Sequence, residues 1–167
     1  MTDGIRVRNL NQADVPRILE IQAAAYEPHL LEVGGVFAAK IGAHPDHSLG
    51  VEGPDGVLIA YVIAFPMSST ASVGLHETDP RTIDPQGDAP ILYVHDMAVH
   101  PDAHGSGAGT ALLRALEALG AERGQTVIEL VAIEPAVGFW RRRGFTATDD
   151  EVYPGYGPGA RKMRRAL

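Results

Sequence analysis

The sequence contains no cysteine. This absence excludes a disulfide framework, a zinc site made of thiolates and a cysteine nucleophile. Positive charge is also scarce, because 14 Lys and Arg residues stand against 21 Asp and Glu residues, a formal net charge of −7. General nucleic-acid binders carry a basic surface, so this balance argues against a nucleic-acid partner. Any anionic ligand must therefore be held by local fields.

Long apolar runs are missing as well. No stretch approaches the roughly 20 apolar residues that span a bilayer. Residues 1–25 lack the charged-then-apolar pattern of a signal peptide. We therefore expect a soluble, cytoplasmic protein with no membrane partner. The 167 residues, 45% of them hydrophobic, fit one domain (1–167) that can bury about 70% of its unfolded surface.

Alternate glycines stand out in the stretch HGSGAG, residues 104–109, just before a predicted amphipathic helix that begins near Ala108. Glycines let a backbone bend tightly and turn consecutive N–H groups toward a ligand. The first turn of the helix adds unsatisfied N–H groups and a partial positive charge. The pattern predicts a cradle for a phosphate or pyrophosphate, with a plain solvent-exposed turn as the alternative.

The segments on either side of this loop predict a βαβ unit over residues 91–133. Ile91–Val99 and Val127–Ile133 have the apolar character of strands, and the second is nearly continuously apolar, as in a parallel strand covered on both faces. The helix between them has leucines at helical spacing and ends at Gly124.

The rest of the chain alternates short strands and helices separated by turn residues. The expected elements are a strand at Ile5–Val7, a helix capped by Asp14 and ending at Ala25, a weaker helix at Val36–Ile41, a hairpin of Ser48–Val51 and Val57–Phe65, a short helix between Pro135 and Gly144, and an edge strand at Ala160–Leu167. Residues 66–90 show no sustained period. We expect a lid beside the site there, because such long loops in compact domains tend to be functional.

Two phosphate-binding motifs fit the loop poorly. A nucleotide-hydrolase loop needs a Lys followed by Ser or Thr after its last glycine, whereas Thr110 follows Gly109 directly and no Lys is near. A dinucleotide fingerprint needs G-x-G-x-x-G, but these glycines are spaced G-x-G-x-G. The chain that remains after the second strand is also too short for further βαβ units.

A third pattern fits better. The stretch from Val99 to Leu113, VHPDAHGSGAGTALL, resembles the acyl-CoA signature V-x-P-x-x-(R/Q)-G-x-G-x-(G/A) of the GNAT superfamily of N-acyltransferases. Glu134–Phe145, EPAVGFWRRRGF, resembles that family's later helix, N-x-x-A-x-x-(F/L)-Y-x-x-x-G-F. The resemblance implies an α/β (α+β) fold with a mixed central sheet and helices on both faces. Two parallel strands of that sheet would splay apart to admit the thioester of acetyl-CoA.

The resemblance also implies where CoA would bind. Backbone N–H groups of the loop would hold the pyrophosphate, the strand before it would pair with the pantetheine arm, and the N–H near Met97 would polarise the acetyl carbonyl. One arginine of the late helix would add positive potential. The implied cofactor-binding residues are Met97, Ala98, Val99, His104, Gly105, Ser106, Gly107, Ala108, Gly109, Thr110, Glu134, Trp140 and Arg143.

Three positions depart from the family pattern. His104 stands where the signature prefers Arg or Gln, a change that backbone-mediated binding tolerates. Glu134 replaces an Asn that usually meets the pantetheine arm. Trp140 replaces the Tyr that often protonates the leaving thiolate, and an indole cannot do so at neutral pH. Either another residue supplies this proton or no acid is needed.

Candidate catalytic residues lie on the strand before the loop and in a late glycine-rich loop. Aminolysis of a thioester needs a neutral amine, whereas an amine of pKa about 10.4 is almost fully protonated at pH 7. His95 and Asp96 are therefore candidate bases, and Asp96 is also a candidate for binding the amine. The alternatives are a hydrogen-bonded strand histidine and a structural carboxylate. Tyr153 and Tyr156 are candidate proton donors, with plain packing as the alternative.

The acceptor is expected after the first helix, where the family commonly forms this pocket. Tyr26, Glu27 and Glu32 are the candidate substrate-binding residues, and acids there would favour a cationic amine; solvated surface charge is the alternative. His100 and His104 lie four apart but on a loop, so we expect no metal site.

The sequence thus predicts an enzyme that transfers an acetyl group from acetyl-CoA to a primary amine of a small molecule or peptide by direct attack, as a monomer or homodimer. The alternatives are a non-catalytic CoA-binding sensor of the same fold and a nucleotide or dinucleotide binder.

Overall fold

The computed structural model describes residues 4–68 and 89–167. Their strands form one seven-stranded sheet with the order β1-β2-β3-β4-β5-β7-β6. The strands are β1 (Arg6–Asn9), β2 (Ser48–Glu52), β3 (Leu58–Met67), β4 (Ile91–Val99), β5 (Val127–Ala132), β6 (Thr146–Ala147) and β7 (Arg161–Ala166). The helices are α1 (Val15–Ala25), α2 (Gly34–Ala43), α3 (Ala108–Glu122) and α4 (Val137–Arg141).

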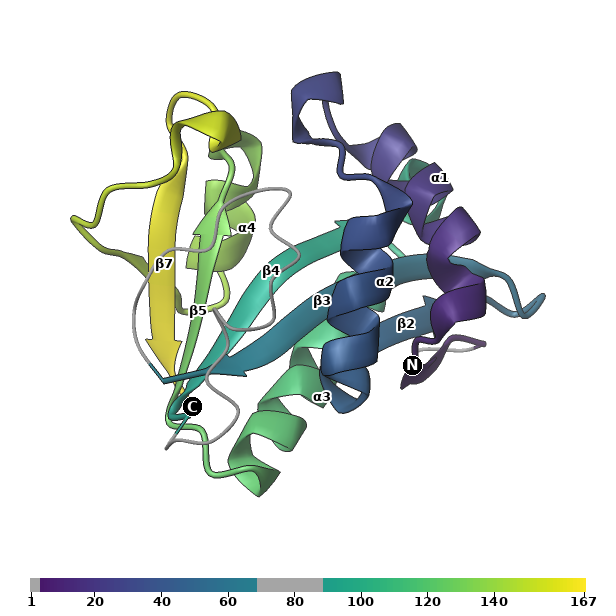
Figure 1. Cartoon of the computed structure of the whole chain (residues 1–167), viewed down its shortest axis with the longest axis horizontal. Helices are drawn as coiled ribbons and strands as arrows, with labels where there is room; N and C mark the ends of the chain where they lie inside the picture. The colour runs from purple at the N-terminus through teal and green to yellow at the C-terminus, as the bar shows by residue number, and fades with distance from the viewer. Residues whose placement is uncertain (1–3, 69–88) are drawn as a thin grey trace.

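Helices lie on both faces of the sheet, as predicted (Figure 1). On one face, apolar residues of α1 and α2 form a core with β3 that includes Ile18, Phe37 and Tyr61. On the other face, Leu112 and Leu116 of α3 join Trp140 of α4 in a larger core over the centre of the sheet. The mixed α+β architecture is therefore confirmed.

The predicted βαβ unit is present as β4, α3 and β5. The two strands run parallel and pair from Ile91 with Val127 to Val94 with Leu130. The helix ends at Glu122, two residues before the predicted Gly124. Gly124 follows the C-cap Arg123, and its φ of +76° is a left-handed conformation that glycine adopts without strain. The strand before the glycine loop and the strand after its helix thus lie side by side at their starts.

Beyond these paired positions β4 and β5 part, as the resemblance implied. In the described strands their pairing stops at Val94 and Leu130, although β4 continues to Val99 (Figure 1). A bulge in β4 accompanies the parting, because Asp96 pairs with Ile63 of β3 and Val94 pairs with Ala64. His95 is the extra residue. A bulge bends its strand and increases the local twist, which turns the end of β4 away from β5.

Two local predictions are wrong. The segment near the C-terminus is no edge strand, because β7 lies between β5 and the two-residue β6, which is too short to produce a sequence pattern. Asp14 does not cap α1 with its side chain. A 3-10 turn precedes the helix, and there the side chain of Asn11 accepts from the N–H of Ala13 while Asp14 accepts from the N–H of Asn11 (both 2.9 Å).

The predicted lid at 66–90 lies mainly outside the described residues, which omit 69–88. Met67, at its start, is the last residue of β3.

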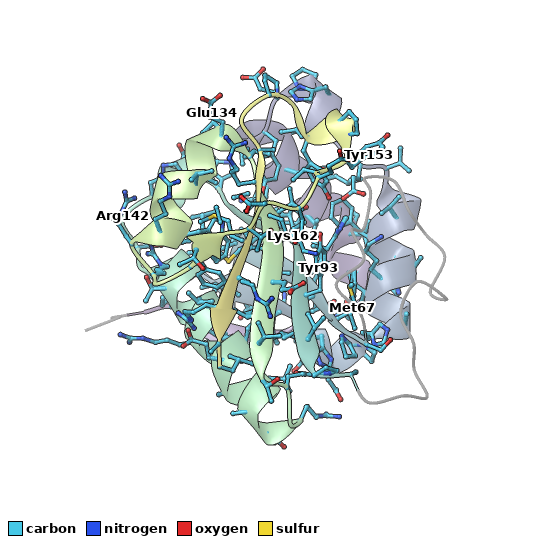
Figure 2. All side chains as sticks on the ribbon, turned by 90° about the vertical axis from the view of Figure 1, so that its left-hand side faces the viewer. Met67, Tyr93, Glu134, Arg142, Tyr153 and Lys162 are labelled. Atoms are coloured by element: carbon cyan, nitrogen blue, oxygen red, sulfur yellow. The ribbon has the colours of Figure 1, made fainter. Side chains whose placement is uncertain are left out.

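A buried ion pair links β7 to β5. Lys162 Nζ lies 3.6 Å from Glu129 Oε2 and 3.7 Å from Asp150 Oδ2, and the Lys162 and Glu129 side chains are only 2% and 1% exposed (Figure 2). Arg164, at 3.8 Å from the other Glu129 oxygen, is 47% exposed. Removing one partner of a buried pair leaves an uncompensated charge out of water.

We therefore expect Lys162→Met to lower the free energy of unfolding by about 3–5 kcal/mol, measured by urea denaturation. Arg164→Met, which affects the same carboxylate from the surface, should cost under about 1 kcal/mol. Adding Glu129→Gln to Lys162→Met should restore much of the loss. Equal losses for the two single variants would show that burial of the pair does not govern its contribution.

Candidate functional site

The glycine loop and the first turn of α3 line one wall of an open groove of about 640 Å³. Gly105 and Gly107 have φ values of +84° and +83°, so glycine is needed at both. The loop leads directly into the fifteen-residue helix α3. The N–H groups in the first turn of this helix have no intrahelical partner. This is the geometry of an anion site, as the sequence predicted.

The groove brings together the predicted cofactor-binding residues with one exception. Residues 97–99, 104–110, Trp140 and Arg143 all line it. Glu134 does not; it is exposed and lies against Gly159. At the loop end of the groove, Arg143 donates to the hydroxyl of Thr110 (3.1 Å) and stacks 3.5 Å from the ring centre of Phe139. A fixed guanidinium thus lies beside the anion site.

The parting of the strands exposes the backbone of β4 along the groove. The N–H of His100 donates to Ile59 of β3 (2.8 Å), and pairing in an antiparallel ladder alternates from residue to residue. Met97 and Val99 therefore direct their N–H and C=O groups away from β3, to the side that β5 has left. A ligand in the groove would meet a row of backbone groups that an extra strand would normally pair.

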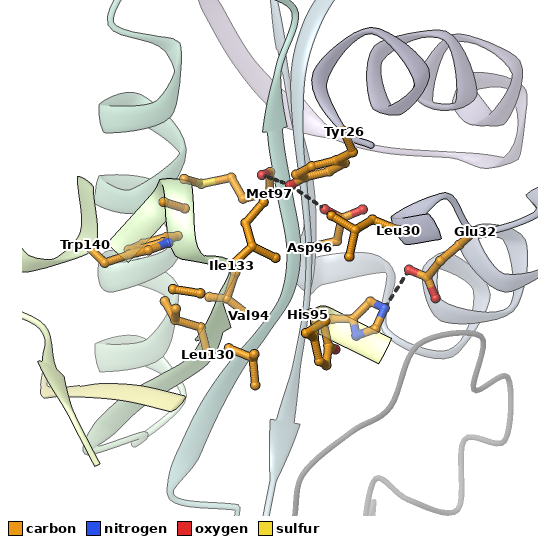
Figure 3. A pocket seen from close by; sticks show the side chains of 14 residues that line it. Tyr26, Leu30, Glu32, Val94, His95, Asp96, Met97, Leu130, Ile133 and Trp140 are labelled. Atoms are coloured by element: carbon orange, nitrogen blue, oxygen red, sulfur yellow. Dashed lines mark hydrogen bonds and ion pairs between the residues drawn. The ribbon is translucent and has the colours of Figure 1, made fainter. Parts of the chain in front are cut away.

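A second cavity of about 140 Å³ lies between the parted strands, and it shares five lining residues with the groove. The shared residues are Tyr26, Met97, Ile133, Ala136 and Trp140. Figure 3 shows that the lining divides into two halves. An apolar half contains Val94, Met97, Leu130, Ile133 and Trp140; a polar half contains Tyr26, Glu32, His95 and Asp96. Within the described lining there are two carboxylates and no Lys or Arg.

His95 and Glu32 form a buried pair in the polar half. His95 Nε2 lies 2.8 Å from Glu32 Oε1, and the two side chains are 0% and 2% exposed. Among the described residues, Nδ1 of His95 has no hydrogen-bond partner. An ionised Glu32 fixes the tautomer with the proton on Nε2 and leaves a lone pair on Nδ1. This pair consists of a predicted base and a predicted substrate-binding residue.

Asp96 is held by two tyrosines. Its Oδ2 accepts from the Tyr61 hydroxyl (2.7 Å), and its Oδ1 lies 2.9 Å from the Tyr26 hydroxyl, which also donates to the carbonyl of Met97 (2.5 Å; Figure 3). Removal from water raises the pKa of Asp96 above its ordinary value. Burial also raises the pKa values of Tyr26 and Tyr61, and the neighbouring Asp96 adds to this effect.

The remaining predicted residues lie in different places. Tyr156 is buried and lines the inner cavity, whereas Tyr153 is 47% exposed and lines a separate depression (Figure 2). Glu27 is exposed and lines neither the groove nor the inner cavity. Tyr61 is a residue of the site that was not predicted. The only indication in the sequence is that its hydroxyl lies within an otherwise apolar strand.

The described part of the chain contains neither a metal-binding cluster nor a membrane-spanning helix. No three His, Asp or Glu side chains there gather into a group that could hold a metal ion. No helix among them is long and apolar enough to cross a membrane.

Solved structures confirm the fold. The chain matches "GphF GNAT-like decarboxylase in complex with isobutyryl-CoA" with a TM-score of 0.81 at 15% identity, covering 96% of this chain and 98% of that one. It matches the loading GNATL domain of CurA from Lyngbya majuscula with a TM-score of 0.78 at 12% identity, covering 96% of each chain. Identity this low supports the fold alone.

A third solved structure is similar as well. Arabidopsis thaliana Naa50, in complex with the bisubstrate analogue CoA-Ac-MVNAL, has a TM-score of 0.71 at 14% identity, covering 98% of this chain and 99% of that one. No curated protein matches the sequence. The sequence model of the Acetyltransferase (GNAT) family, however, matches residues 13–145, most of the chain. The chain therefore belongs to the GNAT family of acetyltransferases.

Proposed function

We propose that this protein transfers the acetyl group of acetyl-CoA to the primary amine of a small molecule or peptide by direct attack. The observation that carries the proposal is the parted end of β4, where a groove leading from the glycine loop joins a cavity with an apolar half and an acidic half. The groove supports binding of a long, extended molecule with anionic groups at the loop. The two halves of the cavity match an acyl group and a cationic amine.

The acyl group is assigned to the apolar half. Val94, Leu130 and Trp140 would exclude water from the methyl group. The N–H of Met97, directed away from β3, is available to polarise the thioester carbonyl as charge develops on its oxygen. A carboxylated acyl group would meet the carboxylate of Glu32 and no Lys or Arg, so the described lining disfavours it.

The amine is assigned to the polar half. The carboxylate of Glu32 favours approach of a cationic amine, which releases one proton to water before attack. His95 is assigned to receive the next proton, from the attacking nitrogen. In the proposed step, the lone pair on Nδ1 accepts a proton from the attacking nitrogen while Glu32 stabilises the imidazolium through Nε2. His95 is thus assigned the role of base, and Glu32 that of a positioning residue.

Direct transfer follows from the side chains present. The described lining of the inner cavity contains no Ser, Thr or Lys, and the sequence contains no Cys. A histidine is present, but its free nitrogen is needed as the base. We therefore infer a ternary complex without an acyl-enzyme.

The central test supplies acetyl-CoA with a panel of small amines and short peptides and follows free thiol. We expect amine-dependent release in the wild type, a kcat lower by about 10²- to 10⁴-fold in His95→Gln, and an unchanged KM for acetyl-CoA. His44→Gln, at a half-buried histidine outside groove and cavity, is the matched control. CoA binding without any thiol release would favour the sensor, and an unaltered pH–rate profile in His95→Gln would remove His95 as the base.

The glycine loop is tested by CoA affinity. Gly105 and Gly124, both with left-handed φ and open space around an added Cβ, precede and follow α3. Either Gly→Ala change should cost about 1–2 kcal/mol of stability through backbone strain. Only Gly105→Ala should also weaken CoA binding in calorimetry, by about tenfold, because it displaces N–H groups of the groove. Equal CoA affinities for the two variants would contradict the assignment of the loop.

A further inference from the structure

The departing thiolate of CoA needs a proton, and Trp140 stands where the family often has a tyrosine. The sulfur would lie at the junction of groove and cavity, since the acyl group and the pantetheine arm extend to either side. Among the five residues lining both spaces, Tyr26 and Trp140 alone carry a polar side-chain hydrogen. An indole N–H is only a hydrogen-bond donor, so Tyr26 is the one residue there that can give up a proton.

The hydrogen bonds around Tyr26 indicate a protonated neighbour. Its hydroxyl oxygen lies 2.5 Å from the carbonyl oxygen of Met97 and 2.9 Å from Asp96 Oδ1. A carbonyl oxygen can only accept, so with an ionised Asp96 the single phenol proton is shared between two acceptors. A proton on Asp96 would end this competition, because the carboxyl group could then donate to the phenol oxygen. The Tyr61 hydroxyl, at 2.7 Å, serves the other oxygen of Asp96.

We propose that Asp96 is a neutral carboxylic acid in the resting enzyme and that Asp96 and Tyr26 form a two-step proton relay to the leaving thiolate. This inference rests on the proposed acyl transfer. It assigns Tyr26, which touches the sulfur, as the proton donor and Asp96 as the residue that replenishes it.

Protons balance in this scheme. As the carbon–sulfur bond breaks, its electron pair stays on sulfur. The phenol proton of Tyr26 leaves its hydrogen bond to the Met97 carbonyl and passes to the sulfur. The phenol oxygen takes the carboxyl proton of Asp96 in the same step. A cationic amine has released one proton to bulk water before attack, and His95 has gained a second one from the attacking nitrogen. One proton must therefore pass from His95 to Asp96, directly or through water, before the next turnover.

A relay is needed because Tyr26 alone is a poor acid. Burial raises the pKa of Tyr26 above its ordinary value. Transfer of a proton from a lone phenol to the thiolate would therefore be unfavourable in free energy. Passing the charge on to Asp96 removes this obstacle, since even a raised carboxyl pKa leaves an acid stronger than a phenol. The groups facing Asp96 are Tyr26 after α1, Glu32 before α2, Tyr61 on β3 and His95 on β4.

A double-mutant cycle tests the relay. Tyr26→Phe and Asp96→Asn should each lower kcat by about 100-fold while KM for acetyl-CoA stays within about twofold. The double variant should be no slower than either single one, because the two residues act as one unit. Tyr93→Phe removes a buried hydroxyl of β4 outside groove and cavity and should behave as wild type. A double variant whose loss of kcat equals the product of the two single losses would overturn the relay, and so would an active Tyr26→Phe variant. Neither result would contradict the proposed acetyl transfer.

Thermal unfolding against pH tests the protonation of Asp96 without activity. A carboxyl with a raised folded-state pKa binds more protons folded than unfolded, so stability falls as pH rises from its unfolded pKa to its folded pKa. Asparagine preserves the hydrogen-bond pattern of the neutral acid and cannot ionise. The melting temperature of Asp96→Asn should therefore match wild type in acid and exceed it increasingly as pH rises.

The opposite trend, with Asp96→Asn losing stability relative to wild type as pH rises, would identify an ionised carboxylate and overturn the proposal. If the wild type transfers no acyl group, relay and proposed function fall together, and the melting curves still decide whether Asp96 carries the proton.

Discussion

The site depends on one interruption of backbone pairing, the point after Val94 and Leu130 where β4 and β5 part. Up to this point the sheet is continuous and its core is closed. Beyond it, the same divergence provides the cavity, the N–H of Met97 directed to the open side, and the junction with the groove. The divergence of β4 from β5 thus accounts for the inner cavity, for the backbone N–H groups that face it, and for the groove through which a ligand would enter.

The bulge at His95 has a second effect, on side-chain direction. Successive residues of a regular strand point to opposite faces of the sheet. His95 and Asp96 are adjacent, yet both contact the α1 and α2 side, His95 through Glu32 and Asp96 through Tyr26 and Tyr61. The extra residue resets the alternation, so the imidazole of His95 and the carboxyl group of Asp96 lie side by side.

Charge is separated along the site. The chain is acidic overall, with a formal net charge of −7. The proposed anion site consists of backbone N–H groups and Arg143, which is fixed by Thr110 and Phe139. The acids of the inner cavity lie at the far end of the same route. A ligand that is anionic at one end and receives a cationic partner at the other is therefore oriented by the field of the protein.

The sequence carried the local features but not their assembly. The glycine loop, its helix and the flanking strands follow from short-range spacing and glycine geometry, and they lie where predicted. The pairing of Glu32 with His95 joins residues 63 positions apart, and no periodicity encodes it. Likewise, the sequence around Tyr61 predicts only a core aromatic residue. Its contact with Asp96 depends on the bulge in β4, which the sequence pattern does not indicate. β6, with two residues, is too short for any pattern, so β7 was mistaken for an edge.

The unpaired backbone of β4 can also be regarded as a sheet edge within the molecule. Exposed edges invite other chains to add as strands and cause aggregation, and proteins usually shield them with charge, proline or short length. Here α1 and its following loop flank one side of the gap and α4 flanks the other, with Tyr26 and Trp140 at its walls. We therefore expect the gap to favour an occupant that is thin. A slender chain without bulky substituents should pair with this edge more readily than a polypeptide strand with full side chains.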